Sequence, residues 1–231
     1  MKSIVRNTLA VGLVACLFGA AAPAVAQSST ASTQDRSAQA KAPTKAKVGE
    51  KAPAFTLTDA DGKSHNLNDW SGKTVVLQWI NPDCPVCRRV MENGSVAKAY
   101  ADSVQANPNV VWITVNSTHY MEPSKTKAYL TENKMPTLPA LVDRDGTVGR
   151  MYGARTTPHI FVISDEGVLV YEGAFDDNAS GTATEGITNY AVNAVKQLKA
   201  GETVAPANVR PYGCSVKYAG GGKNKRSRDR G

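Results

Sequence analysis

The sequence is poor in residues that bind metal ions, with four cysteines and three histidines among 231 residues. Cys84 and Cys87 form a Cys-x-x-Cys pair, which is half of a common structural zinc site. The other half would be a second pair of cysteine or histidine ligands, and the sequence contains none. We therefore set zinc aside and interpret the pair as redox-active, in preference to two ordinary core cysteines.

The sequence also lacks an apolar run long enough for a typical membrane span. The run near the N-terminus is short for a span of about 20 residues and is interrupted by glycine and proline. Lys2 and Arg6 precede the core of this run, and Ala24–Ala26 supplies a small-x-small cleavage pattern. Residues 1–26 therefore predict a secretory signal peptide, with no stable transmembrane span after its removal.

A second export signal overlaps the first. Leu13–Cys16 resembles a bacterial lipoprotein cleavage site, but the residues after Cys16 stay apolar, so we favour cleavage after Ala26. Both routes export the domain, and we expect a bacterial periplasmic location. Disulfides persist in such a compartment, which gives the Cys-x-x-Cys pair a chemical context.

The central part of the chain carries little net charge. The formal net charge of +7 sits in the two ends, which are residues 1–47 and a Gly-rich, basic tail at 219–231. Residues 27–47 are polar, have no aromatic residue and predict a disordered linker. A nucleic-acid site needs basic residues on a folded surface with aromatics between them. We therefore predict a solvated tail and no nucleic-acid partner.

Residues 48–218 have the size of one domain with a substantial core. Within them, Thr74–Ile80 is apolar apart from a few neutral polar residues, which predicts a buried strand. Asn81–Asp83 ends this strand, and Pro85 suits the first turn of a helix. The chain therefore delivers Cys84 to a helix N-terminus.

A helix N-terminus favours the thiolate form of a cysteine, because its free amides and its dipole stabilise negative charge. Arg88 and Arg89 would act in the same direction, and Asp83 would oppose them. We expect Cys84 to be the more exposed thiol, with a pKa below that of a free cysteine. The thiolate is the form that attacks disulfides.

The other elements alternate in a way that predicts an α/β fold. Extended runs flank Asp61–Gly62, which predicts an N-terminal β-hairpin. Strands separated by helices and followed by a second hairpin predict a mixed sheet with helices on both faces. The expected helices are 85–92, 95–104 (capped by Ser95), 124–134, 146–152 and 187–198, and the later strands are 110–115, 138–142, 159–163 and 168–171.

Several short motifs resemble those of the thioredoxin-like superfamily, and more closely its redoxin branch. That branch includes alkyl hydroperoxide reductases, thiol-specific antioxidants and TlpA-like periplasmic thioredoxins. A C-terminal Gly-Cys-Ser-Val-Lys ending resembles one subgroup with few assigned activities. The motifs are Val48-Gly49, Ala52-Pro53, Phe55-x-Leu57, Asp61-Gly62-Lys63, Cys84-Pro-Val-Cys87, Thr156-Thr157-Pro158 and Arg210–Lys217.

This resemblance implies a thioredoxin-like three-layer sandwich over residues 48–218 and a redox site that needs no cofactor. It also implies that Pro158 follows a cis peptide bond and lies against the Cys-x-x-Cys pair. Its neighbour Thr157 is then expected to offer backbone groups that pair with a bound substrate chain.

Three departures from the family patterns bear on mechanism. Thioredoxins carry a buried acid six residues before the first cysteine, and this chain has Gln78, so water or Glu92 must take the proton of Cys87. The Pro-Val dipeptide leaves the redox direction open. Peroxiredoxins place proline seven and threonine or serine three residues before the reactive cysteine, and neither Cys84 nor Cys87 has them.

We therefore predict an exported thiol–disulfide oxidoreductase with antioxidant character. Cys84 attacks a protein or small-molecule disulfide, Cys87 resolves the mixed disulfide, and an unknown redox partner completes the cycle. A thiol-dependent peroxidase is one alternative. A module that binds copper(I) through Cys84, Cys87 and His159 is another, although His159 is more simply a strand-start histidine that packs beside the disulfide.

Cys214 is the third thiol of the domain, and an odd number of cysteines in an exported protein needs an explanation. Residues 211–218 are apolar and aromatic enough to pack back on the domain as a short extended segment. Cys214 could be a buried structural thiol, could form a second disulfide with Cys84, or could pair between two chains. Because burial slows thiol chemistry, we favour the structural interpretation.

Overall fold

The computed structural model describes residues 45–135 and 137–220. The predicted signal peptide, most of the linker and nearly all of the basic tail lie outside these residues. Ala46, which we assigned to the linker, donates a backbone hydrogen bond to Met151 and packs against the core. The packed chain therefore begins slightly before Val48. Within the described ranges, no helix has the length and apolar character required to cross a membrane.

The fold is built around a mixed sheet of eight strands in the order β2-β1-β5-β4-β3-β7-β8-β9. Its central strand β3 is buried at every position, and it pairs in parallel with β4 and antiparallel with β7. The sheet strands are β1 (Thr56–Asp59), β2 (Ser64–Asn66), β3 (Thr74–Trp79), β4 (Val110–Asn116), β5 (Ala140–Val142), β7 (His159–Ile163), β8 (Leu169–Gly173) and β9 (Asn208–Val209).

The helices supply the crossovers that parallel strands require. The helices α1 (Pro85–Glu92) and α2 (Ser95–Ala106) connect β3 to β4, and α3 (Pro123–Glu132) connects β4 to β5. The hairpin β1–β2 turns at Gly62, as predicted. The remaining helices are η1 (Leu67–Trp70), α4 (Thr147–Tyr152) and α5 (Tyr190–Lys199).

The break between α1 and α2 is where we expected it, but its cap is different. Ser95 is the first residue of α2 and does not cap it. Gly94 stands at the cap position in the left-handed conformation, with φ 82°. The side chain of Asn93 accepts a hydrogen bond from the amide of Ser95 at 2.9 Å. Glycine is needed here because a side chain at this φ would be strained.

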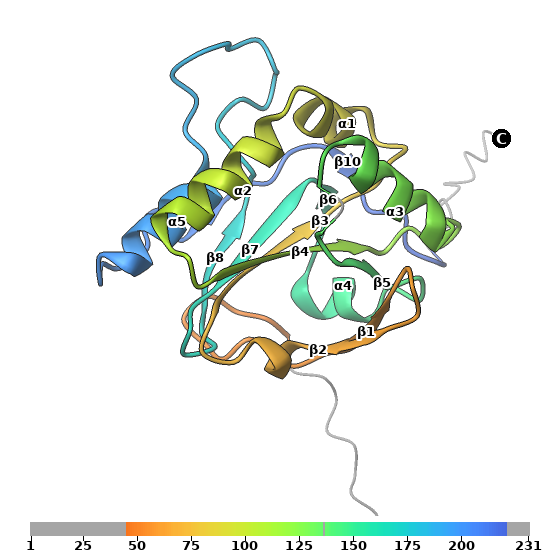
Figure 1. The fold of residues 1–231 in the computed structure, drawn as a ribbon, viewed down its shortest axis with the longest axis horizontal. Helices are drawn as coiled ribbons and strands as arrows, with labels where there is room; N and C mark the ends of the chain where they lie inside the picture. Colours follow the sequence, from red (N-terminus) through yellow and green to blue (C-terminus); the bar gives the residue numbers. More distant parts are fainter. Residues whose placement is uncertain (1–44, 136, 221–231) are drawn as a thin grey trace, which may run out of the picture. The chain divides into compact units, whose positions relative to one another are not determined.

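Two apolar clusters lie on the two faces of the sheet, which confirms the α/β three-layer class (Figure 1). One face is covered by α1, α2, α3 and α5. The other is covered by α4, η1 and the extended chain before β1. This second layer has less helix than we expected, because only the short α4 and η1 are helical there.

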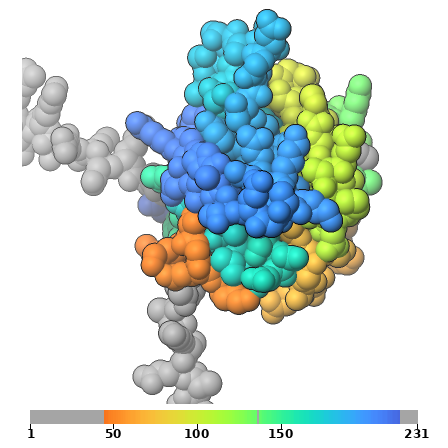
Figure 2. Space-filling view, turned by 90° about the vertical axis from the view of Figure 1, so that its left-hand side faces the viewer, coloured from red at the N-terminus to blue at the C-terminus, as the bar shows by residue number. Residues whose placement is uncertain are grey.

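The C-terminal part of the chain differs most from the expectation. The last helix α5 begins at Tyr190, so Ile187 precedes it and is exposed. After α5 the chain forms β9 and then β10 (Cys214–Ser215), which pairs with β6 (Thr156–Thr157) in a separate two-stranded sheet. Figure 2 shows α5 and the residues that follow it, in blue, spread over one side of the molecule.

Candidate functional site

The site begins where the buried strand β3 ends. The amide of Cys84 donates to the carbonyl of Asn81 at 3.0 Å, which turns the chain into α1. Cys84 is the N-cap of α1, and its Sγ accepts a hydrogen bond from the amide of Cys87 at 3.4 Å. Pro85 occupies the first turn, where its missing N–H costs no helical hydrogen bond. The predicted placement of Cys84 at a helix N-terminus is confirmed.

Cys84 is not the exposed thiol that we predicted. Its exposed fraction is 1% and that of Cys87 is 0%. The cover over Cys84 comes from the C-terminal segment, because β10 lies next to α1 and pairs with β6 (Figure 1). The exposure prediction was wrong because it considered the helix terminus without the segment that packs over it.

The pKa of Cys84 is lowered, as predicted, and an amide of the helix N-terminus contributes to this, but the two arginines do not. Burial acts to raise it, but the neighbouring side chains of Cys214 and Thr157 and the hydrogen bond from the Cys87 amide together lower it by more. The two arginines are engaged elsewhere. Arg88 pairs with Glu92 at 2.8 Å, and Arg89 donates to backbone carbonyls of the loop at 178–179.

Cys87 has the opposite character. Complete burial, together with the nearby Cys84 and Cys214 thiols, raises the pKa of Cys87 to about 12, although the Asn81 backbone and the Tyr129 hydroxyl lower it in part. The two thiols of the pair therefore differ in acidity, because the pKa of Cys84 is lowered and that of Cys87 is raised.

Tyr129 is a site residue that sequence reasoning missed. Its hydroxyl lies beside Cys87 at the buried side of α3, and it has no hydrogen-bond partner among the residues described. The expected acceptor Glu92 is on the exposed face of α1 and pairs with Arg88. Gln78 is fully buried, and its Oε1 accepts from the indole of Trp112 at 2.9 Å.

The loop that faces the thiols contains the predicted cis bond, which joins Thr157 to Pro158. The Cys84 thiol donates to the carbonyl of Thr157 at 3.1 Å, although the two residues are 73 positions apart. In β10, Cys214 stands opposite Thr157, and Ser215 stands opposite Thr156. The backbone edge expected to bind a substrate chain is therefore paired with the protein's own C-terminal segment.

His159 does not form a metal site with the thiols. Its Nδ1 accepts a hydrogen bond from the amide of Arg155 at 3.2 Å, and its ring packs on Phe161 at 4.5 Å between centroids. Burial and the charge of Arg155 lower the pKa of His159 to about 3. Over residues 45–135 and 137–220, no three His, Cys, Asp or Glu side chains come together to hold a metal ion. His159 fits the packing role that we gave as the simpler interpretation.

Cys214 packs back on the domain in an extended segment, as predicted, but it does not behave as a buried core thiol. It is partly exposed and lies against Cys84 and the start of α1. Burial and the neighbouring Cys84 raise its pKa. We refer to residues 208–218 as the C-terminal strap.

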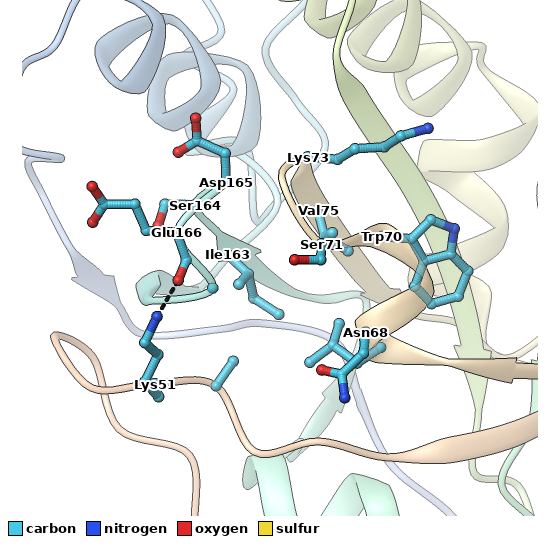
Figure 3. Close-up of a pocket in the computed structure, with 13 residues that line it drawn as sticks. Lys51, Asn68, Trp70, Ser71, Lys73, Val75, Ile163, Ser164, Asp165 and Glu166 are labelled. Carbon is cyan, nitrogen blue, oxygen red and sulfur yellow. Dashed lines mark hydrogen bonds between the residues drawn. The ribbon is translucent and has the colours of Figure 1, made fainter.

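Two hollows of the domain differ in how close they lie to the thiols. A groove of about 610 Å³ runs along the strap from Val209 to Gly213 and is bounded on the other side by Thr156 and Asp176. A second hollow, of about 200 Å³, lies at the start of β3 (Figure 3). It is lined by Lys51, Trp70 and neighbouring residues but by no thiol, and Lys51 bonds to the carbonyl of Glu166 across it. Only the first hollow borders the redox site.

Comparisons with known proteins agree with this geometry. The redoxin family pattern matches residues 47–189. Thiol-disulfide oxidoreductase ResA of Halalkalibacterium halodurans is 28% identical over 125 residues, which are 54% of this chain and 67% of that protein. ResA of Bacillus subtilis is 28% identical over 148 residues, which are 64% and 75% of the two chains.

A solved structure has a similar fold. A hypothetical protein of Sinorhizobium meliloti 1021 is 26% identical, with a TM-score of 0.67 over 78% of this chain and 98% of that one. The family pattern covers more than half of the sequence. The chain therefore belongs to the redoxin family and has the thioredoxin-like fold.

Proposed function

We propose that this protein is an exported thiol–disulfide oxidoreductase whose reactive group is the Cys84–Cys87 dithiol. The observation that carries the proposal is the contrast between the two thiols. Cys84 caps α1 and has a lowered pKa, whereas Cys87 is buried and has a raised one. The names of the ResA relatives give independent support.

The reducing direction follows from this contrast. The Cys84 thiolate attacks one sulfur of a substrate disulfide, so that a mixed disulfide forms and the other substrate sulfur leaves as a thiolate. Cys87 then loses its proton and attacks Sγ of Cys84. The substrate leaves with two electrons and two protons, and the protein keeps a Cys84–Cys87 disulfide. The oxidising direction uses the same steps in reverse.

Tyr129 serves the second step. Its hydroxyl is neutral and cannot act as a base at ordinary pH, since burial raises its own pKa further. It can donate a hydrogen bond to the Cys87 thiolate as that thiolate forms. The proton itself goes to the departing substrate thiolate or to water. A buried acid would help Cys87 by taking its proton. Tyr129 helps instead by stabilising the Cys87 thiolate through a hydrogen bond.

Thr157 and Pro158 form the substrate side of the site in this proposal. The carbonyl of Thr157 already accepts a hydrogen bond from Cys84, so a chain paired with Thr157 lies next to the reactive sulfur. This geometry favours an extended protein segment with a disulfide or thiol as substrate. Addition of such a segment to a free backbone edge is a common mode of peptide recognition.

Export is proposed from the sequence of residues 1–26, with cleavage after Ala26. Attachment of lipid at Cys16 would bring the domain to the same side of the membrane. The reaction itself also fits an exported protein, because dithiol–disulfide partners are consumed and regenerated where disulfides persist.

The peroxidase alternative has less support. A peroxide pocket needs a hydroxyl and a proline at set positions before the reactive cysteine, and Leu77 and Asn81 stand there instead.

The test is insulin reduction by the purified protein with Cys84→Ser and Cys87→Ser variants. Cys84→Ser abolishes the activity, and Cys87→Ser allows one attack and leaves a stable mixed disulfide at Cys84. Asn68→Ser, an exposed substitution near the hollow at the start of β3, serves as a control and leaves the rate unchanged. Hydrogen peroxide turnover without any insulin reduction would replace this proposal with the peroxidase alternative.

A further inference from the structure

The C-terminal strap occupies the position that a substrate chain would need. β10 forms an antiparallel pair with β6 at the residue before the cis proline, with Cys214 opposite Thr157. An extended substrate beside Cys84 would use the same backbone edge. The strap therefore occupies the backbone edge on which a substrate peptide would pair.

Both ends of the strap are fixed to the domain. At its start, β9 pairs with β8, and the side chain of Asn208 donates to Glu172 at 2.6 Å. At its end, the hydroxyl of Tyr218 donates to the carbonyl of Ala154 at 2.7 Å, and the Arg150 guanidinium lies 4.5 Å from the centre of the Tyr218 ring. The part between these anchors passes over Cys84.

In this middle part of the strap, the thiol of Cys214 lies beside Sγ of Cys84. Its side chain interacts with that of Cys84, and it also lies at the backbone amide of Val86 in the first turn of α1. Both thiols thus share one helix N-terminus. A cysteine at this point of a bound chain is positioned as a substrate cysteine would be.

Gly213 allows the strap to approach this closely. Its φ is +119°, and a Cβ at this position would lie 2.2 Å from the carbonyl oxygen of Thr157. That separation is far below van der Waals contact, and the atom in the way is backbone. Any other residue at position 213 would push β10 away from β6 and carry Cys214 away from Cys84.

We propose that Cys214 is a third exchange partner of Cys84 and that the strap is a built-in substrate of the dithiol. This inference rests on the function proposed above. In the oxidised protein, the Cys214 thiolate attacks Sγ of Cys84, the Cys84–Cys87 bond breaks, and a Cys84–Cys214 bond forms. Cys87 leaves as a thiolate and takes up the proton that Cys214 lost. One disulfide replaces another, so no external oxidant or reductant is needed.

The strap also limits access to Cys84. An outside disulfide can reach the buried Sγ of Cys84 only after the strap has moved. The observed reaction rate is then the rate of the open form multiplied by the fraction of molecules that are open. The anchors at β9 and Tyr218 hold the ends while the middle moves. Large protein substrates therefore react through an open minor state.

The direct test uses oxidised glutathione and peptide mapping on the Cys87→Ser variant. Glutathione first joins Cys84, and Cys214 then displaces it, which releases reduced glutathione and leaves a Cys84–Cys214 disulfide as the main product. In the double variant Cys87→Ser/Cys214→Ser, Cys84 keeps its glutathione.

The outcomes separate this inference from the proposed function. Stable glutathione on Cys84 with a free Cys214 in Cys87→Ser would overturn the inference alone. A Cys214-linked dimer would overturn it as well. Unmodified Cys84 in both variants would overturn the inference together with the proposed function.

A second test moves the strap and keeps every thiol. Gly213→Ala in the Cys87→Ser background lowers the yield of the Cys84–Cys214 disulfide at least tenfold. In the otherwise native chain it speeds insulin reduction roughly tenfold, as expected if a ladder of a few hydrogen bonds is lost. Gly201→Ala is the matched control, because it has φ +73° and nothing within 4 Å of the added Cβ. Equal effects of the two substitutions would contradict the role given to the strap.

Discussion

Tyr129→Phe tests the activation of Cys87. The substitution removes one oxygen atom and keeps the buried aromatic ring on α3. The hydroxyl lies beside Cys87 and has no hydrogen-bond partner in the part of the chain that the structure describes, so it is free to donate to the Cys87 thiolate. A hydrogen bond to a charged group contributes about 1.5–3 kcal/mol. Loss of even the lower value slows the attack by Cys87 roughly tenfold, since about 1.4 kcal/mol corresponds to a factor of ten.

The assay is a single-turnover reaction with a model disulfide, quenched with acid and read by intact mass. In Tyr129→Phe, the mixed disulfide at Cys84 accumulates, and the pH profile of its decay moves to higher pH because the pKa of Cys87 rises further. Formation of the mixed disulfide keeps its rate. Tyr100→Phe is the control, because Tyr100 is a partly buried tyrosine on the neighbouring helix α2, with its ring edge-on to that of Trp112 at 6.4 Å between centroids. A decay rate and pH profile equal to those of the native protein would refute the role of Tyr129.

Two further predictions concern stability. The pKa of Cys87 is about 12 in the folded protein against an ordinary value of 9.0. The protonated Cys87 thiol therefore contributes its full stabilisation below pH 9, and this stabilisation is lost as the pH rises toward 12. From pH 8 to pH 10, the reduced native protein should lose about 1.4 kcal/mol more unfolding free energy than Cys87→Ala in urea titrations. An equal loss in both would contradict the raised pKa. Asp143→Asn should lower the free energy of unfolding in urea titrations by about 2 kcal/mol, because Asp143 accepts hydrogen bonds from Ser117 and from the amides of Val148 and Gly149. The control Asp165→Asn, at an exposed position, should leave the free energy of unfolding unchanged.

The central sheet was predictable because its signals are local. Thr74–Ile80 is mostly apolar and carries no charge, Pro82 ends it, and Pro85 starts the helix, so the position of Cys84 followed from adjacent residues. The hairpin at Asp61–Gly62 was equally local. The cis bond before Pro158 was predicted from the family resemblance, since composition alone gives no reason to expect it.

The contacts that define the site's chemistry were not local. Cys84 is buried because β10 pairs with β6. The residues around Cys214 do not indicate which strand this segment will pair with. Gly213 was the available signal, because a glycine beside a cysteine permits close approach to another backbone. Tyr129 sits in a mostly polar helix, whose pattern did not identify the side chain that faces Cys87.

The measurement that tests the central claim most directly is a redox titration of the protein against glutathione buffers, with the free thiols counted by alkylation and peptide mapping. We expect one two-electron step, in which the free thiols among Cys84, Cys87 and Cys214 fall from three to one. The alkylated cysteine in the oxidised form is Cys214 or Cys87, and never Cys84. Three alkylatable thiols at every glutathione ratio would contradict the claim that this protein works by dithiol–disulfide exchange.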